Sequence, residues 1–305
     1  MRINDKQMFS LDALPKIRGE YRLDFPLNKS NWFQVGGRAD VLFKPADAED
    51  LIYFFQNIDN SIPITILGVG SNIIIRDAGI EGVVIKLGRK FTDIKRNGTE
   101  ITVGAACLNH NFANFCADNG LTGLEFLIGI PGSIGGGIAM NAGSYGSEFK
   151  DFLKQVKAVD YSGNIHIIPK QDMGFKYRGN NKQKLIFLEA TFELSHNEPD
   201  AIRARMAEIT KKREETQPIR ERTGGSTFAN PPGCSAWKLI DEAGLRGFKI
   251  GGALMSEKHC NFMINDGTAT AGDLENLGDY IRQKVSNTKG ISLEWEIKRI
   301  GRKTN

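Results

Sequence analysis

The stretch GIPGSIGGGIAMNAG at residues 129–143 constrains this chain most, because six glycines and a proline occur there without a charged side chain. Residues that lack a side chain allow backbone N–H groups to approach an anion closely, so such a stretch is typical of a phosphate-binding loop. It is equally compatible with a pair of tight turns, since glycine-rich segments also occur wherever a chain bends. Taken alone, the stretch leaves both interpretations open.

A second glycine loop favours the phosphate interpretation. LGVGSN at residues 67–72 follows the apolar run PITI and precedes IIIRD, so it lies at the end of a predicted strand. Two such loops suggest a ligand with two phosphates, to which Ser71, Asn72 and Ser133 could donate hydrogen bonds. No Walker-type GxxxxGKS or GxxxxGKT motif occurs, and no GxGxxG opens a helix after the first strand. A P-loop site and a Rossmann fold are therefore disfavoured.

The composition is typical of a soluble globular protein with two or three domains. Of the 305 residues, 40% are apolar and 25% are charged, and a net charge of +4 is too small to favour a nucleic-acid partner. The four cysteines show no metal-ligand or CxxC spacing, so we expect reduced thiols and no bound metal. No run approaches the roughly 20 apolar residues of a membrane span, and we expect a cytoplasmic protein.

Apolar periodicity predicts a mixed α and β chain. Residues 1–20 are expected to form an amphipathic N-terminal helix with Leu11, Leu14 and Ile17 on one side. Short apolar strands alternate with turns up to residue 197, and a polar helix at 199–215 follows. The remainder is expected to contain two helices, a strand at NFMIND and a final strand, ISLEWEIKRIG. We expect four parts: the N-terminal helix (residues 1–20), two parts that contain the short strands (21–90 and 91–197), and a C-terminal part (198–305).

Motifs along most of the chain resemble those of a known enzyme family. They occur in order between about residues 28 and 301: NWFQVGGRADVLFKP, LGVGSNIIIRD, GLEFLIGIPGSIGGGIAMNAGSYGSE, YRGN, GGSTFANPPG, AWKLIDEAGLRGFKIGGALMSEKHCNFMIN and LEWEIKRIG. Together they are similar to UDP-N-acetylenolpyruvoylglucosamine reductase of bacterial peptidoglycan synthesis. The chain lacks the tyrosine-bearing loop of longer members, so it resembles the shorter, type II subfamily.

The resemblance implies a fold class, a cofactor and a substrate. The expected fold is α+β, an FAD-binding vanillyl-alcohol-oxidase/PCMH-type fold of two α/β subdomains followed by a C-terminal α+β substrate-binding domain whose last strand returns to the FAD-binding part. Non-covalent FAD, NADPH as hydride donor and a UDP-sugar substrate are implied, without nucleic acid, membrane or metal, in a monomer. The glycine loops are expected to wrap the FAD pyrophosphate through Gly68, Val69, Gly70, Ser71, Asn72, Gly132, Ser133, Gly136, Gly137, Asn141, Ala142 and Gly143.

Three residues match the catalytic positions of that family. Hydride addition to the terminal vinyl carbon of an enolpyruvyl ether leaves negative charge next to the carboxylate, which calls for a cation and a proton donor. Ser226 in GGSTFANP matches the proton donor, Arg178 in YRGN the arginine that grips the carboxylate, and Glu296 in LEWE the catalytic glutamate. Strand alternation does not choose between Glu294 and Glu296, and Trp295 replaces the proline of the family pattern LEPE.

The resemblance also implies residues that contact the substrate, and two other functions are compatible with a glycine-loop nucleotide site. Tyr177, Asn230 and His259 match positions that contact the sugar nucleotide in relatives, and the helix end near Lys212 and Arg213 could supply a cation. An oxygen-dependent FAD alcohol oxidase of the same fold and a non-catalytic nucleotide-binding module are the alternatives. Neither glycine loop contains a histidine for covalent flavin attachment, and the serine, arginine and glutamate are all present. The reductase is therefore the expected function.

Overall fold

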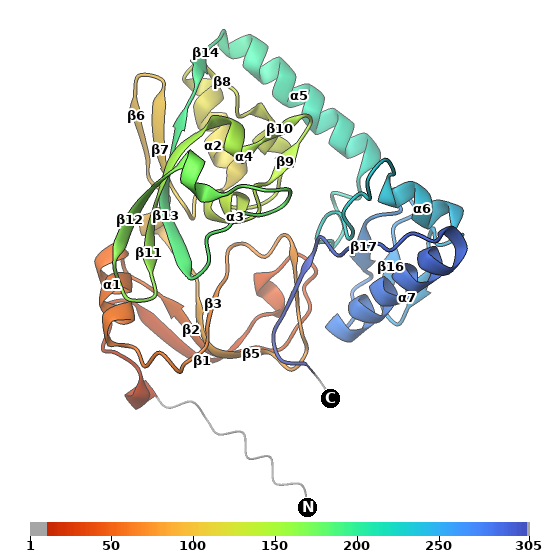
Figure 1. Cartoon of the computed structure of the whole chain (residues 1–305), viewed down its shortest axis with the longest axis horizontal. Coiled ribbons are helices and arrows are strands. Elements are labelled where there is room, and N and C mark those ends of the chain that lie inside the picture. Colours follow the sequence, from red (N-terminus) through yellow and green to blue (C-terminus); the bar gives the residue numbers. More distant parts are fainter. Residues whose placement is uncertain (1–10, 304–305) are drawn as a thin grey trace, which may run out of the picture.

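The computed structural model describes residues 11–303, and its first part is a mixed four-stranded sheet in the order β1-β2-β5-β3 (Figure 1). Its strands are β1 (Glu20–Pro26), β2 (Arg38–Lys44), β3 (Ile64–Ile66) and β5 (Ile80–Ile85). β1 runs antiparallel to β2, whereas β2 and β3 pair in parallel with β5. The helix α1 (Ala48–Asn57) connects β2 to β3. Because β2, β3 and β5 run in parallel, their carboxyl ends lie at the same edge of the sheet.

The predicted N-terminal helix is not formed in its described part. Leu11–Ala13 makes one 3-10 turn, residues 14–19 are irregular and β1 begins at Glu20, while residues 1–10 lie outside the described residues. The backbone amides of Arg18 and Gly19 donate to the Asp50 carboxylate, at 2.7 and 2.9 Å. This tertiary partner satisfies amide groups that a helix would have satisfied internally.

The second part is a five-stranded antiparallel sheet in the order β12-β11-β13-β7-β6. Its strands are β6 (Ile94–Asn97), β7 (Glu100–Gly104), β11 (Leu153–Asp160), β12 (Ile165–Pro169) and β13 (Leu185–Glu193). The shorter elements of the first two parts are η2 (Asn28–Ser30), η3 (Arg89–Phe91), α2 (Asn109–Asp118), β8 (Leu121–Thr122), η4 (Glu125–Gly129), β9 (Gly143–Ser144), β10 (Ser147–Glu148), α4 (Phe149–Phe152), η5 (Lys170–Met173) and β14 (Ser195–His196). β11 and β12 pair antiparallel as a hairpin.

The glycine-rich stretch contains a short helix, α3 (Ile134–Ala139), between two tight segments. Gly137 lets this helix pack against the second core, because a Cβ there would lie 2.3 Å from Cζ of Phe149. Phe149 in turn packs against Phe192 of β13, with ring centroids 6.0 Å apart. The stretch is thus anchored on one side by the core and open on the other.

A long helix, α5 (Pro199–Thr216), leads from the second part to the C-terminal part (Figure 1). The helix predicted at residues 199–215 is thus present, and Ile202, Met206 and Ile209 form its buried face. The C-terminal part combines a three-stranded sheet with two helices: β15 (Lys249–Ile250), β16 (Ala253–Met255), β17 (Met263–Asn265), α6 (Ala236–Glu242) and α7 (Ala271–Lys289). The domain limits inferred from the sequence stay predictions. Within residues 11–303, no helix is both long enough and apolar enough to cross a bilayer.

The end of the chain runs back from the C-terminal part to the first part. β18 (Lys298–Ile300) pairs in parallel with β4 (Ile73–Ile75), directly after the first glycine loop. The predicted strand at residues 291–301 is therefore much shorter than expected. The preceding segment is irregular because it bonds to another part of the chain: Ala229 N donates to Glu294 O, and Glu296 N donates to Thr227 O, both at 2.9 Å.

Trp295, the residue that departs from the family pattern, is packed against α7. A Cβ on Gly278 would lie 2.1 Å from Cη2 of Trp295, so only glycine fits below this ring. We expect Gly278→Ala to destabilise the fold by about 2 kcal/mol, since overpacking costs more than the helix gains from alanine. Gly272→Ala on the same helix is the control, because its Cβ would meet no atom closer than 3.6 Å. Equal thermal unfolding midpoints for the two variants would contradict this packing.

Candidate active site

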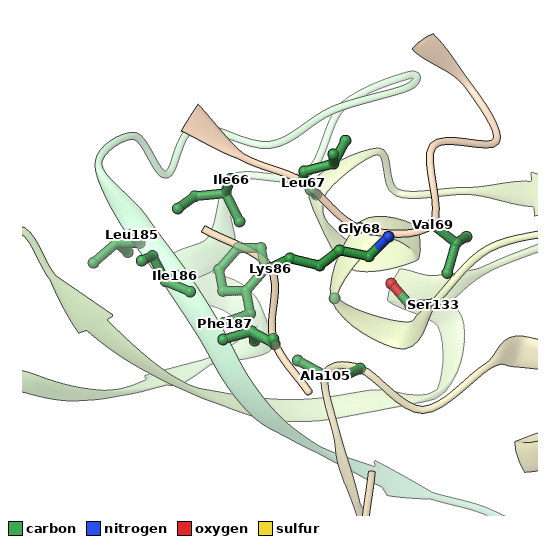
Figure 2. Close-up of a pocket in the computed structure, with 15 residues that line it drawn as sticks. Ile66, Leu67, Gly68, Val69, Lys86, Ala105, Ser133, Leu185, Ile186 and Phe187 are labelled. Carbon is green, nitrogen blue, oxygen red and sulfur yellow. The ribbon is translucent and has the colours of Figure 1, made fainter. Parts of the chain in front are cut away.

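A cavity of about 210 Å³ lies where the two glycine loops meet (Figure 2). One end is apolar and is lined by Ile66, Leu87, Leu185, Ile186 and Phe187. The other end is formed by the glycine loops, and four predicted cofactor residues line it: Gly68, Val69, Ser133 and Gly136. The cavity therefore has a side that suits a flat aromatic ring and a side made of backbone.

The glycine end of the cavity offers unused hydrogen-bond donors. Within residues 11–303, the backbone amides of residues 68–71 and of Gly132 and Ser133 donate no hydrogen bond to another protein group, and the Ser133 hydroxyl has no partner. A Cβ built on Gly68 or on Gly136 would meet a single atom within 4 Å, the Ser133 Oγ, at 3.3 and 3.5 Å. Any other side chain would occupy this space. These residues fit the FAD pyrophosphate that the resemblance implies.

The two loops are held together by side chains near the cavity. Ser71 donates from Oγ to Pro131 O at 2.9 Å, which ties the first loop to the second. Asn109 donates from Nδ2 to Ile130 O at 3.1 Å, yet its fully buried Oδ1 has no hydrogen-bond partner in the described chain. Sequence reasoning missed Asn109, because an asparagine at the start of a helix is ordinarily a cap.

Most of the other predicted cofactor residues support the loops. Eight of them do not line the cavity: Gly70, Ser71, Asn72, Gly132, Gly137, Asn141, Ala142 and Gly143. The Asn141 side chain is fully engaged, since it donates to Glu148 Oε2 and Lys176 O and accepts from Lys150 N. Asn72 donates from Nδ2 to Glu296 O at 3.3 Å, so it links the first glycine loop to the last segment of the chain.

Lys86 lines the cavity although sequence reasoning did not select it. It directly follows β5, and in Figure 2 its side chain crosses the cavity with the ammonium nitrogen toward Gly68 and Ser133. Among the described residues, neither an aspartate nor a glutamate lines the cavity. Burial, and secondarily the positive charge of Lys44, lowers the pKa of Lys86. A lone lysine after an apolar run carries no local signal that could have identified it.

Two of the three predicted catalytic residues are in direct contact. Arg178 Nε donates to Glu296 Oε1 at 2.8 Å, and the side chains are only 25% and 14% exposed. Arg178 adopts φ 52° in a tight turn, and the following Asn180 donates from Nδ2 to Ile138 O and Ala139 O. The glycine-rich helix α3 therefore positions the turn that carries the arginine. The contact distinguishes the two candidate glutamates, because Arg178 contacts Glu296 whereas Glu294 is exposed.

Ser226 lies on the segment that pairs with the glutamate segment. The carbonyl of the next residue, Thr227, accepts from Glu296 N at 2.9 Å, and Ser226 itself forms a backbone bridge with Phe262. The half-buried Ser226 hydroxyl makes no hydrogen bond to a protein group within residues 11–303. A cation, a carboxylate and a free hydroxyl are thus contributed by adjoining segments.

The predicted substrate residues surround this group to different degrees. The Arg178 guanidinium lies 4.9 Å from the Tyr177 ring centroid, and burial, followed by the charge of Glu296, raises the pKa of Tyr177. Asn230 Oδ1 accepts from Ala236 N at 2.9 Å, so its side chain caps α6. His259 packs 4.7 Å from the ring centroid of Phe262, the backbone partner of Ser226, and burial lowers its pKa.

Comparisons with known proteins agree over most of the chain. Residues 39–168 match the family model of an FAD binding domain, and residues 217–300 match that of the C-terminal domain of UDP-N-acetylenolpyruvoylglucosamine reductase. A protein named UDP-N-acetylenolpyruvoylglucosamine reductase from Rickettsia rickettsii is 57% identical over 290 residues, covering 95% of this chain and 98% of the relative. The one from Rickettsia typhi is 55% identical over 293 residues, covering 96% and 99%.

A solved structure is similar over nearly the same length. The crystal structure of UDP-N-acetylenolpyruvylglucosamine reductase from Thermus caldophilus has a TM-score of 0.81 and 33% identity, covering 93% of this chain and 99% of that one. This similarity, with the match to an FAD binding domain, confirms the expected α+β FAD-binding fold.

Proposed function

This chain belongs to the UDP-N-acetylenolpyruvoylglucosamine reductase family, and from this premise we propose how its own residues carry out the reaction. The protein is an FAD-dependent oxidoreductase that uses NADPH to reduce the enolpyruvyl ether of a UDP-sugar to UDP-N-acetylmuramate, a step of peptidoglycan precursor synthesis. The observation that carries the proposed residue roles is the 2.8 Å contact between Arg178 and Glu296, next to the Ser226 segment.

The cavity between the glycine loops is the proposed FAD site. Bound there, FAD supplies the hydride that it has taken from NADPH. The free amides of residues 68–71 and the amide and hydroxyl of Ser133 would hold the pyrophosphate, because no protein acceptor within residues 11–303 occupies these donors, and Gly136 would leave space for it. The apolar end would exclude water from a flat ring. The cofactor is thus held mainly by backbone and is positioned for residues on other segments.

Arg178 is the proposed carboxylate-binding residue. Its Nε contacts Glu296, while the two Nη groups form no hydrogen bond within the described chain and remain available to a second carboxylate. A guanidinium binds a carboxylate in a planar, two-point geometry and stays charged. As the substrate carbon next to the carboxylate gains negative charge, this fixed cation stabilises the enolate. Glu296 contributes by holding the guanidinium in one orientation.

Ser226 is the proposed proton donor to the carbon that bears the ether oxygen. Its hydroxyl is half-buried and makes no bond to a protein acceptor in residues 11–303, so the proton is available for transfer. General acids act only within hydrogen-bond reach of the reacting atom. The backbone pairing of Thr227 with Glu296 would place this hydroxyl and the ion pair on the same side of the substrate.

Arg213 is the proposed cation for the substrate diphosphate. Lys212 forms an exposed ion pair with Glu208 at 2.8 Å, whereas Arg213 is half-buried and its Nε donates to the neutral Gln217 Oε1 at 3.2 Å. Burial lowers the pKa of Arg213, which an anionic ligand would offset. Tyr177, Asn230 and His259 are the further proposed contacts of the sugar nucleotide.

We also propose that the protein acts as a monomer in the cytoplasm. Its partners are small molecules, and both NADPH and a UDP-sugar are soluble nucleotides.

The proposed reaction predicts a two-step change in colour. Purified protein should be yellow, and excess NADPH without oxygen should bleach the flavin absorbance near its visible maximum. Adding the enolpyruvyl UDP-sugar should restore the absorbance and yield UDP-N-acetylmuramate. UDP-N-acetylglucosamine, which lacks the vinyl group, is the control and should restore nothing. Recovery with oxygen but not with the enolpyruvyl sugar would favour an oxidase instead.

A further inference from the structure

We propose that Lys86 is a cofactor-binding residue whose ammonium group pairs with the pyrophosphate of FAD. This inference rests on the proposed function of the cavity and adds to it a charged residue that the glycine loops do not provide. It assigns a role to a side chain outside both loops and outside the Ser226, Arg178 and Glu296 group.

Lys86 is positioned to reach both glycine loops. Its backbone amide donates to Phe43 O of β2 at 2.9 Å, so the start of the side chain is fixed at the carboxyl end of β5. From there the side chain crosses the cavity, and its nitrogen points toward Gly68 of the first loop and Ser133 of the second (Figure 2). These are the places where both loops present unused donors.

The positive charge of Lys86 has no anionic partner within the described chain. The ammonium forms no ion pair or hydrogen bond within residues 11–303, and neither aspartate nor glutamate lines the cavity. The half-buried Arg76, by contrast, pairs with Glu275 at 3.0 Å. A partly buried cation without a protein anion loses hydration without compensation. A diphosphate at the glycine end would supply that compensation.

The glycine loops alone would leave the negative charge of the pyrophosphate unbalanced. Amides and a hydroxyl stabilise an anion by dipoles, but they do not neutralise it. Among the described residues that line the cavity, Lys86 is the one with a positive charge. A charge-assisted hydrogen bond contributes more than a neutral one, which predicts that Lys86 governs both the affinity and its salt dependence.

The test is FAD binding to the apoprotein, measured by quenching of flavin fluorescence at low and high NaCl. Lys86→Met keeps the apolar stem and removes the charge, and we expect it to weaken FAD binding by about 10- to 100-fold at low salt. Lys86→Arg should recover most of the affinity. Lys90→Met removes the same charge from an exposed lysine outside the cavity and is the control. The unfolding midpoint of each apoprotein verifies that it is folded.

The salt series separates charge from packing. The FAD affinity of the unchanged protein should fall with NaCl more steeply than that of Lys86→Met. The proposal is overturned if Lys86→Met binds FAD within twofold of the unchanged protein. It is also overturned if the loss is the same at both salt concentrations and arginine does not rescue it. Failure of the unchanged apoprotein to bind FAD would instead refute the proposed function together with this inference.

Discussion

The Ser226→Ala variant is expected to retain flavin bleaching by NADPH but to lose the second half of the reaction. Rapid mixing of the NADPH-reduced variant with the enolpyruvyl UDP-sugar should show re-oxidation slowed by about 10²- to 10⁴-fold, the usual contribution of a positioned general acid. The physical reason is that the negative charge left on the substrate carbon then has no proton donor. Reduction by NADPH needs no such donor, so its rate should stay within about twofold of normal.

A matched serine controls for the loss of a hydroxyl group. Ser292 is exposed and precedes Glu296 in the same irregular segment, so Ser292→Ala should leave both half-reactions unchanged. Re-oxidation of Ser226→Ala at the normal rate would show that another group donates the proton. Slowing of both half-reactions by the same factor would indicate a disturbed cofactor site instead, because the Ser226 backbone pairs with the C-terminal sheet through Phe262.

Local sequence patterns predicted the parts of the site that depend on local backbone. The glycines at 68 and 136 were identified because residues without a side chain let backbone amides reach an anion, and both line the cavity. Gly137 shows the limit of that reasoning. Its missing side chain makes room for Phe149, which lies on the protein side of the same helix. Glycine content alone does not tell which side needs the space.

Contacts between distant segments could not be predicted. Lys86 reaches the glycine loops only because β5 ends beside them, and no spacing in the sequence records that approach. The choice between Glu294 and Glu296 depended on a regular strand, but the backbone at 294–297 bonds to residues 227–229. Arg178 lies 118 residues before Glu296 in the sequence, yet the two side chains are in direct contact. Tertiary hydrogen bonds replaced the expected strand, as they replaced the N-terminal helix at Asp50.

The three proposed catalytic residues were predicted from the family resemblance, and their geometry explains why each of them alone would not stand out in the sequence. Isolated arginine and glutamate residues usually form surface ion pairs that contribute little. The Arg178–Glu296 pair differs because both side chains are mostly buried and the arginine turn is bonded to α3 through Asn180. This anchoring predicts that the pair works as one unit.

The second large effect is therefore expected for Arg178 and Glu296 together. Arg178→Met should slow substrate-dependent re-oxidation by about 10²- to 10³-fold, the range for removing one preorganised charge-stabilising group. Glu296→Gln should slow it less, because a neutral amide still accepts from Nε but holds the guanidinium less firmly. The double variant should be little slower than Arg178→Met alone, since groups that act as a unit are not additive.

Rapid-mixing kinetics of the three variants form the double-mutant cycle, and Arg299→Met is the matched control. The Arg299 guanidinium lies 4.5 Å from the ring centroid of Trp295 and faces Glu275 and Asp279, so its loss removes one positive charge near the site without removing the Arg178 fork. The Arg299→Met protein should re-oxidise within about twofold of the normal rate, because solvent-screened charges that do not contact the substrate have small effects. If the two single losses multiply in the double variant, Arg178 and Glu296 act independently. Glu296 would then contact the substrate in its own right, and its 2.8 Å contact with Arg178 would not be the source of its effect.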